Sequence, residues 1–430
     1  MAFLMRSLRQ NARCLAARFL SCSRVAQANG TTIKDLAVDA PNKMVLVEWT
    51  DGQIGKFPYV WLKDTSPDPQ TYHIEPAMKA RKLLMTDFDP EVEPKSAVKS
   101  SDGNSVAISW PDGTKSVYES DWLRFRNPSD EEQRVLRRKV YLTQYQTWGR
   151  EEMEGRLKRY DYNQVMTDSK ALHDWLSDVC RDGLGLVVNA PATDGIVHKI
   201  GDRIGMIQKS HFGNVFDVVV KPDASNMAYS HSGELPLHTD FPALSENPNM
   251  QMLHMIEKAT SGGESTFTDG FRVAEQMREE KPELFKMLST VSLEYIEEGY
   301  DKNDEHDRFD YDNITRHKII NMDDQGNFTK TWFGNAMRSW FYDIPPEQIL
   351  PMYRAMKTYV DYCYQDRNFF KLALEPGDIV LWGNDRLLHA RMAFEGQRKL
   401  QGCYFCWDII RSKVRHLRDL LELPENQPSI

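Results

Sequence analysis

The segment LALEPGDIVLWGNDRLLHARM, residues 372–392, carries the pattern from which the fold is predicted. A turn at Pro-Gly-Asp precedes the apolar run IVLW, and a second apolar run follows a polar loop, so the segment indicates turn, strand, loop and strand. Similar short strands recur through the larger part of the chain, interrupted by helices expected at 271–289 and about 346–366. Several short strands around a large body favour a mainly β double-sheet jelly roll with flanking helices over a parallel α/β sheet.

Residues 32–127 are predicted to form a separate, small β-rich N-terminal domain. The stretches at 44–62 and 105–123 each contain two runs of alternating apolar residues around an Asp-Gly pair, which is a signal for a β-hairpin. The charged segment at 128–150 is expected to be a helical linker, which leaves 151–423 for the larger domain.

Residues 1–31 are basic and contain five arginines before the first acidic residue, Asp35. Helically spaced apolar residues with interspersed serines are typical of a mitochondrial transit peptide. The apolar runs are too short to cross a membrane. A mitochondrial location is therefore predicted, and the alternative is a cytoplasmic protein with a basic tail.

The composition excludes several classes of function. A net charge of −9 leaves no basic stripe for nucleic acid, and six cysteines are too few for a disulfide framework. The chain contains no glycine-rich phosphate loop, no G-x-S-x-G and no H-E-x-x-H. We expect a small-molecule partner and neither nucleic acid nor a membrane.

The segment LPLHTDFPAL, residues 235–244, places His238 and Asp240 two residues apart. In an extended segment these side chains point to the same side and can face one ion. A second histidine would complete the triad of two histidines and one carboxylate that is typical of non-haem Fe(II) oxygenases. The pair alone is common in proteins, so the prediction depends on a third ligand elsewhere in the chain.

His389 is the candidate for that third ligand, on a strand that would fold back beside the first. Arg398 follows nine residues later, on the next predicted strand. A guanidinium there could bind a carboxylate through two hydrogen bonds, as the distal carboxylate of 2-oxoglutarate requires. The alternative interpretation of His389 alone is a core histidine.

From about Val45 to Leu417 the chain resembles the γ-butyrobetaine dioxygenase and trimethyllysine dioxygenase family, the Fe(II)/2-oxoglutarate hydroxylases of carnitine biosynthesis. The stretches that carry the resemblance are WLKD, ARKLLM, SWPDG, DWL, NMAYS, HTDFPAL, GGES, VDYCY, PGDIVLWGNDRLLHAR and GCYFCWD.

The resemblance implies a double-stranded β-helix (jelly-roll) catalytic domain behind the small N-terminal domain. It implies His238, Asp240 and His389 as iron ligands, with Arg398 and Ser265 on the cosubstrate. Fe(II), 2-oxoglutarate and O2 are implied as cofactor and cosubstrates, with ascorbate as the reductant, and a homodimer is the family's usual assembly.

Substrates of this family carry a trimethylammonium group, which an aromatic cage can hold by cation–π attraction. The resemblance implies six substrate-binding residues: Phe212, Phe216, Asn226, Tyr229, Asn335 and Tyr404. Phenylalanine stands at 212 and 216 where the family often has Tyr and Trp, and a core role is the alternative for these rings.

The expected reaction is hydroxylation of γ-butyrobetaine to L-carnitine, with release of succinate and CO2. An asparagine at 226 favours this substrate, because trimethyllysine hydroxylases tend to have an aspartate there. The short spacing from His389 to Arg398, the GCY motif and the basic N-terminus favour trimethyllysine, which is the second candidate substrate. The chain is also compatible with an inactive quaternary-amine-binding relative and with a taurine-type dioxygenase.

One family feature is missing from the N-terminal domain. The resemblance implies a structural zinc site there, but Ser66, Asp68, Thr71 and Thr114 stand at the positions of its three cysteines and one histidine. These side chains do not make a tetrahedral zinc site. We therefore expect no zinc, and a small domain held together by its apolar strands.

Overall fold

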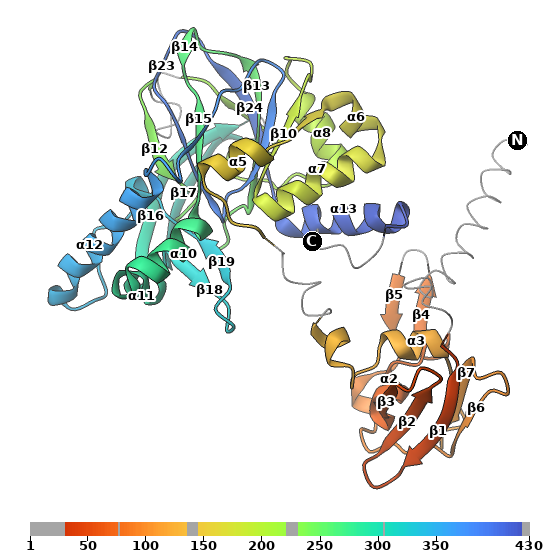
Figure 1. Ribbon diagram of the computed structural model, residues 1–430. Helices are drawn as coiled ribbons and strands as arrows, with labels where there is room; N and C mark the ends of the chain where they lie inside the picture. Colours follow the sequence, from red (N-terminus) through yellow and green to blue (C-terminus); the bar gives the residue numbers. More distant parts are fainter. Residues whose placement is uncertain (1–30, 76–77, 136–144, 221–230, 304–305, 424–430) are drawn as a thin grey trace, which may run out of the picture. The chain divides into compact units, whose positions relative to one another are not determined.

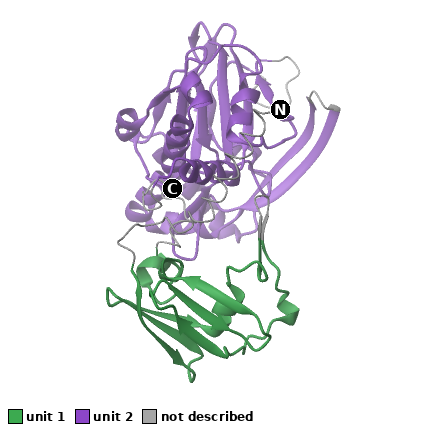
Figure 2. Cartoon of the chain, turned by 90° about the vertical axis from the view of Figure 1, so that its right-hand side faces the viewer, with its two compact units in different colours: residues 1–142 green, residues 143–430 purple. Residues whose placement is uncertain are grey.

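The computed structural model describes residues 31–75, 78–135, 145–220, 231–303 and 306–423. The chain divides into two compact units, Met1–Leu142 and Thr143–Ile430 (Figure 2). No helix within the described ranges has the length and apolar character needed to cross a membrane. The basic segment predicted at 1–31 lies outside these ranges apart from its last residue.

The first unit contains the two hairpins that the Asp-Gly pairs predict. Strands β2 (Met44–Trp49) and β3 (Ile54–Pro58) pair antiparallel, and so do β7 (Ser105–Ser109) and β8 (Lys115–Glu119). The remaining elements of this unit are β1 (Ile33–Asp39), α2 (Tyr59–Asp64), β4 (Tyr72–Glu75), β5 (Met78–Arg81), η1 (Met85–Asp87), β6 (Ser96–Lys99) and α3 (Ser120–Phe125).

A hydrogen-bonded turn occupies the segment where the family zinc site would lie. The Asp68 carboxylate accepts hydrogen bonds from the hydroxyls of Ser66 and Thr71, at 2.5 Å and 3.3 Å. The core of the unit is apolar, with Trp49, Phe57 and Trp110 fully buried. The described strands of this unit are therefore joined by an apolar core, with polar side chains satisfying one another in the turn.

Two sheets of four or more strands form the body of the second unit (Figure 1). The larger has the order β11 (Phe216–Val218), β24 (Lys399–Phe405), β13 (Met250–Glu257), β21 (Ile379–Gly383), β10 (Leu184–Val188) and β9 (Arg159–Asp161). The smaller has the order β12 (Leu235–His238), β22 (Leu387–Arg391), β15 (Ser265–Asp269) and β20 (Phe370–Leu372). Residues 372–392 contribute β21 to the first sheet and β22 to the second, so this segment joins the two sheets of the predicted jelly roll.

Apolar side chains fill the space between the sheets. Phe267 of β15 packs edge-on against Trp382 of β21, with ring centroids 5.4 Å apart. Leu387 of β22 and Val380 of β21 belong to the same buried cluster. This core fixes β22, and with it His389, against the larger sheet.

Helices cover the outer sides of the two sheets (Figure 1). On one side lie α6 (Tyr162–Thr167), α7 (Ser169–Asp182), α8 (Ile196–Ile204) and α13 (Trp407–Leu420), and on the other α10 (Gly270–Glu280), α11 (Pro282–Thr290) and α12 (Pro346–Cys363). Helix α5 (Arg150–Arg156) contacts β20 of the smaller sheet. The other strands form three antiparallel pairs: β14 (Ser261–Gly262) with β23 (Phe394–Glu395), β16 (Leu293–Asn303) with β17 (His306–His317), and β18 (Ile320–Met322) with β19 (Phe328–Thr331). The short helix η2 (Asn335–Met337) follows β19.

The single helix predicted at 271–289 is two helices. The break falls at Lys281, whose backbone (φ −140°, ψ 57°) is not helical, and Pro282 starts α11. Proline disfavours the α conformation of the residue before it and suits the first turn of a helix, which explains the boundary.

Candidate metal centre

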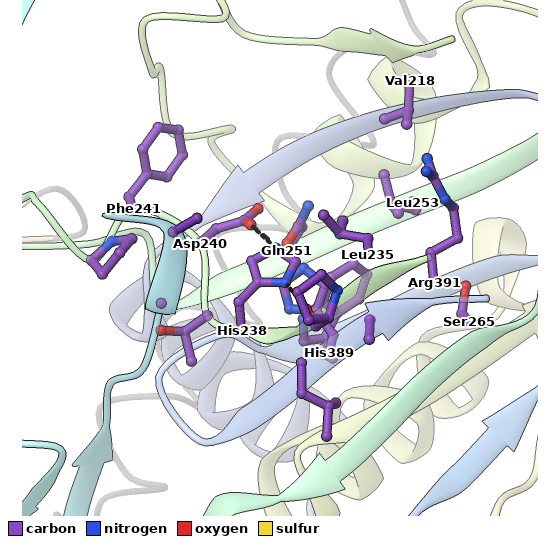
Figure 3. Close-up of a pocket in the computed structure, with 18 of the residues that line it drawn as sticks. Val218, Leu235, His238, Asp240, Phe241, Gln251, Leu253, Ser265, His389 and Arg391 are labelled. Carbon is purple, nitrogen blue, oxygen red and sulfur yellow. Dashed lines mark hydrogen bonds and ion pairs between the residues drawn. The ribbon is translucent and has the colours of Figure 1, made fainter. Parts of the chain in front are cut away.

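The two halves of the predicted triad meet across one pair of strands. His238 ends β12 and stands directly opposite His389 of β22 in the antiparallel register. Their imidazole centroids are 4.3 Å apart, and the Asp240 Oδ1 atom lies 3.2 Å from His238 Nε2 and 3.5 Å from His389 Nε2 (Figure 3). In the described part of the chain, this is the one group of three or more His, Cys, Asp or Glu side chains close enough to share an ion.

Buried hydrogen bonds fix the backbone of the ligand segment. Asn384, in the loop between β21 and β22, accepts from the Asp240 amide at 2.7 Å and donates to the Asp240 carbonyl at 3.1 Å. The Thr239 amide donates to the Phe333 carbonyl at 2.8 Å. Phe241 has φ +57°, a left-handed conformation that is uncommon for a non-glycine residue. The chain therefore turns sharply after Asp240 and sends the Phe241 ring to one side of the centre.

Electrostatics keep Asp240 ionised. Burial alone would raise its pKa, but the neighbouring charges and hydrogen bonds of His389 and His238 outweigh burial and hold the pKa well below its usual range. Burial also opposes protonation of His238, but the Asp240 hydrogen bond and charge raise its pKa. Burial and the charge of His238 lower the pKa of His389.

The donor set fits a divalent iron ion. His238 Nδ1 lies 2.8 Å from the Pro236 carbonyl, so Nδ1 carries the proton and Nε2 is left as a ligand. Two imidazole nitrogens from the β12–β22 pair and one carboxylate oxygen from the segment just after β12 match the facial triad of non-haem Fe(II) enzymes.

Two buried arginines, Arg391 and Arg398, line the same cavity. Arg398 is 7% exposed, its pKa is lowered to about 10 by burial and by the charge of Arg391, and its Nε atom has no hydrogen-bond partner among the described residues. No carboxylate of the described residues lies within salt-bridge distance of Arg398. A buried guanidinium without a counter-ion is costly, so this position calls for an anionic ligand such as the distal carboxylate of 2-oxoglutarate.

Ser265 lies beside these arginines. It is buried on β15, directly opposite Arg391 of β22, and it lines the cavity (Figure 3). Gly263 (φ +77°) approaches Arg398 closely, because a Cβ atom at 263 would lie 3.3 Å from the guanidinium Nε. A glycine here leaves room for the arginine.

Four aromatic rings that contact one another also line the cavity. Phe216 stacks on Tyr404 with centroids 5.0 Å apart, and Phe212 lies 5.7 Å from Phe216. Phe241 adds a fourth ring, 5.3 Å from Tyr404. The sequence prediction missed Phe241, although its place one residue after Asp240 offered a signal. Figure 3 shows Phe241 on the side of the centre away from Ser265 and Arg391.

The cavity has a volume of about 170 Å³ and brings most of the predicted site residues together. Asn335 of η2 lines it, and the Asn335 Oδ1 atom accepts a hydrogen bond from Arg338 Nη2 at 3.3 Å. Gln251 and Glu297 also line it and were not predicted. Asn226 and Tyr229 lie in 221–230, outside the described residues.

Comparisons with known proteins agree with this geometry. Residues 139–404 match the model of the taurine catabolism dioxygenase TauD, TfdA family, and residues 36–124 match a γ-butyrobetaine hydroxylase-like N-terminal model. The human γ-butyrobetaine dioxygenase is 33% identical over 91% of this chain and 98% of its own length. The bovine mitochondrial trimethyllysine dioxygenase is 26% identical over 84% of this chain and 83% of its own length.

Among solved structures, PvcB, described as an Fe, alpha-ketoglutarate dependent oxygenase from an isonitrile synthetic pathway, is similar at a TM-score of 0.40 and 20% identity, covering 54% of this chain and 79% of that one. The family model spans more than half of this chain and includes His238, Asp240 and His389. The chain therefore belongs to the TauD, TfdA family of dioxygenases, whose cofactor and cosubstrate are Fe(II) and 2-oxoglutarate.

Proposed function

We propose that this protein hydroxylates γ-butyrobetaine to L-carnitine, with conversion of 2-oxoglutarate to succinate and CO2. The observation that carries the proposal is one cavity that holds a His-Asp-His triad, a buried arginine without a counter-ion among the described residues and a wall of aromatic rings. The 33% sequence identity to the human γ-butyrobetaine dioxygenase, over 91% of this chain, supports the same substrate.

Each part of the cavity has a role in this proposal. His238, Asp240 and His389 hold the iron, and Arg398 and Ser265 hold 2-oxoglutarate. When bound, Fe(II) with 2-oxoglutarate and O2 supplies the oxidising chemistry that replaces a C–H bond with C–OH. The Tyr404 hydroxyl donates a hydrogen bond to Asp240 Oδ2 at 2.7 Å and so orients this metal ligand.

The aromatic wall orients the substrate and excludes water. Phe212, Phe216, Phe241 and Tyr404 line the cavity. A quaternary ammonium cannot donate hydrogen bonds but is attracted to the faces of aromatic rings. Because Arg338 occupies the carbonyl oxygen of Asn335, the Asn335 amide NH2 is left to donate to a substrate carboxylate. The family resemblance adds Asn226 and Tyr229 to these contacts.

Trimethyllysine is the second candidate substrate. The nine-residue spacing from His389 to Arg398 and the similarity to the bovine enzyme favour it. An inactive amine-binding relative is less well supported, because the triad side chains lie within a distance at which they can share an ion.

Parallel turnover assays distinguish these candidates. The purified protein is incubated with Fe(II), ascorbate and 2-oxoglutarate, and with either γ-butyrobetaine or trimethyllysine, and succinate and hydroxylated product are measured. We expect kcat/KM to be at least about tenfold higher for γ-butyrobetaine, a preference of about 1.4 kcal/mol. A higher value for trimethyllysine would contradict the proposal, and no product from either would support the inactive relative.

The cellular setting is part of the same proposal. Residues 1–31 direct the protein to mitochondria, residues 32–127 and 151–423 act as small and catalytic domains, and the assembly is a homodimer. Transit-peptide composition, the two hairpin motifs and the family resemblance support these points. Microscopy of the full chain against the chain lacking 1–31, and light scattering of the purified protein, test location and assembly.

A further inference from the structure

Glu297 is an acidic residue of the cavity that the metal centre does not use. It lies on β16, and its side chain lines the cavity together with that of Asp240. Its Oε2 atom is shielded from solvent and has no hydrogen-bond partner among the described residues. A buried polar atom without a partner costs about 1–3 kcal/mol. The cavity therefore presents a carboxyl group that a ligand can satisfy.

The position of Glu297 is set by the end of β16 that contacts η2. Tyr295 forms an antiparallel bridge with Arg338, and the Ser339 amide donates to the Glu294 carbonyl at 2.9 Å. Alternation along the strand places Glu297 on the same face as Tyr295, two residues further from the bridge. In an antiparallel arrangement that position runs alongside η2, which carries Asn335.

The surroundings of Glu297 favour its neutral form. Burial raises its pKa to about 7, and the negative charges of Asp240 and Asp301 act in the same direction. The charged or titratable groups on neighbouring elements have other partners. The His211 ring stacks on the Tyr311 ring of β17, with centroids 4.4 Å apart, and Arg338 donates a hydrogen bond to Asn335. Within the described residues, no lysine, arginine or histidine forms a salt bridge with Glu297. A neutral carboxyl group can donate a hydrogen bond as well as accept one.

We infer that Glu297 is a substrate-contacting residue whose protonated carboxyl group donates a hydrogen bond to the substrate carboxylate, beside the amide of Asn335. The inference deepens the proposed function and rests on it. γ-Butyrobetaine has only a carboxylate at this end, which needs donors. Trimethyllysine also has an α-ammonium group, which would need an ionised Glu297. The protonation state of this one side chain therefore helps to select between the two substrates.

Calorimetric binding of γ-butyrobetaine to the anaerobic protein loaded with Fe(II) and 2-oxoglutarate tests this inference without turnover. For Glu297→Ala we expect the Kd to rise at least about tenfold, because a hydrogen bond to a charged group is lost. For Glu297→Gln we expect a Kd within about threefold of wild type, because the amide still donates. Glu298→Gln is the matched control, since Glu298 is exposed and its side chain points to the other side of the same strand.

The pH dependence gives a second readout. Because binding requires the protonated carboxyl group, the wild-type Kd should rise about tenfold per pH unit above the pKa of Glu297, and Glu297→Gln should remove that rise. Thermal melting of each variant checks that it folds.

Three results would overturn the inference. A Kd in Glu297→Gln as high as in Glu297→Ala would mean that Glu297 does not donate a hydrogen bond to the substrate but acts through its negative charge on the trimethylammonium group. An unchanged Kd in Glu297→Ala would mean that it does not touch the substrate. Failure of the wild-type protein to bind γ-butyrobetaine would overturn the proposed function and this inference with it. The wild-type measurement alone separates that result from the first two, in which the wild-type protein binds and only the variants decide.

Discussion

Asp240 uses both oxygens of its carboxylate, and its surroundings decide how well the centre binds iron. Oδ1 lies near the two histidines, and Oδ2 accepts the hydrogen bond from Tyr404. Tyr404 therefore has two separable roles, because its ring belongs to the aromatic wall and its hydroxyl orients a metal ligand. Such partners of metal ligands commonly contribute about 10–100-fold to metal affinity.

Tyr404→Phe separates these roles. The ring and its stacking on Phe216 are kept, so we expect the KM for γ-butyrobetaine to change little, while the Kd for Fe(II) rises about tenfold or more. Equilibrium titration with Fe(II) under anaerobic conditions measures the effect. Tyr362→Phe is the control, since the Tyr362 hydroxyl donates to Glu280 on α10. An unchanged Fe(II) affinity in Tyr404→Phe would show that the hydroxyl does not support the centre.

Arg398 gives a second prediction at this scale. If its guanidinium holds 2-oxoglutarate by two charge-assisted hydrogen bonds, Arg398→Ala should raise the KM for 2-oxoglutarate about 100-fold or more, and Arg398→Lys should recover only part of the loss. Steady-state kinetics with the second substrate saturating measures it. A wild-type KM in Arg398→Lys would indicate that the positive charge alone suffices. An unchanged KM in Arg398→Ala would show that Arg398 does not bind 2-oxoglutarate.

The sequence predicted the residues whose chemistry is visible in their spacing and missed those placed by strand register. The His-x-Asp pair, a distant histidine and a following arginine could be recognised because an iron site requires those types. Gln251 and Glu297 were missed, since glutamine and glutamate are ordinary strand residues. They enter the cavity only because β13 and β16 take a particular place in the fold.

At the scale of elements, the loop between β21 and β22 fixes the segment that carries Asp240. Asn384 in that loop is fully buried, and its side chain makes three hydrogen bonds, two to the backbone of Asp240 and one of 2.8 Å to the Pro248 carbonyl. The same loop leads into His389 of β22. One loop therefore positions all three ligands with respect to one another.

Asn384→Ala should destabilise both the fold and the metal centre. It leaves buried backbone groups without partners, so we expect a loss of about 2–4 kcal/mol in the free energy of unfolding and a weaker affinity for Fe(II). Chemical denaturation and Fe(II) titration measure the two effects. Asn321→Ala is the control, because the Asn321 side chain donates to the carbonyl of Lys318, just before β18, and to that of Lys330 on β19. Equal loss of Fe(II) affinity in both variants would contradict a specific role for Asn384.

Helix boundaries illustrate a limit of sequence patterns at this scale. The apolar spacing continues across 271–289 and predicts one helix, but Pro282 sets the boundary between α10 and α11. Periodicity reports which face is buried, and proline geometry decides where the backbone must leave the helix.

At the scale of the whole molecule, a buried ion pair ties distant parts of the second unit together. Arg386 donates to both carboxylate oxygens of Asp269 and also to the carbonyls of Arg181, at 2.8 Å, and Gln146, at 2.7 Å. These residues come from the β21–β22 loop, the end of β15, the end of α7 and the segment before α5. The pair is nearly free of solvent.

Arg386→Met should therefore cost about 3–5 kcal/mol in the free energy of unfolding, because it leaves the Asp269 carboxylate buried and unpaired. Lys357→Met is the control, because it removes an exposed pair with Asp361 on α12 and should cost less than about 1 kcal/mol. Urea denaturation measures both, and similar costs would contradict the account of the core.

The jelly roll could be predicted because short strands and turns recur along the chain. The pairing of the strands could not, since β21 and β22 are adjacent in the sequence but belong to different sheets. Strand order depends on packing between distant segments, and that packing brings His389 to His238.

The most direct test of the central claim is a coupled product assay with wild-type protein and Asp240→Ala. With Fe(II), 2-oxoglutarate and γ-butyrobetaine, we predict that wild type forms succinate and hydroxylated product in equal amounts, as magnetic resonance can quantify. Asp240→Ala should form neither above background while remaining folded. Full hydroxylation by Asp240→Ala, or succinate release in wild type that does not depend on γ-butyrobetaine, would contradict the account.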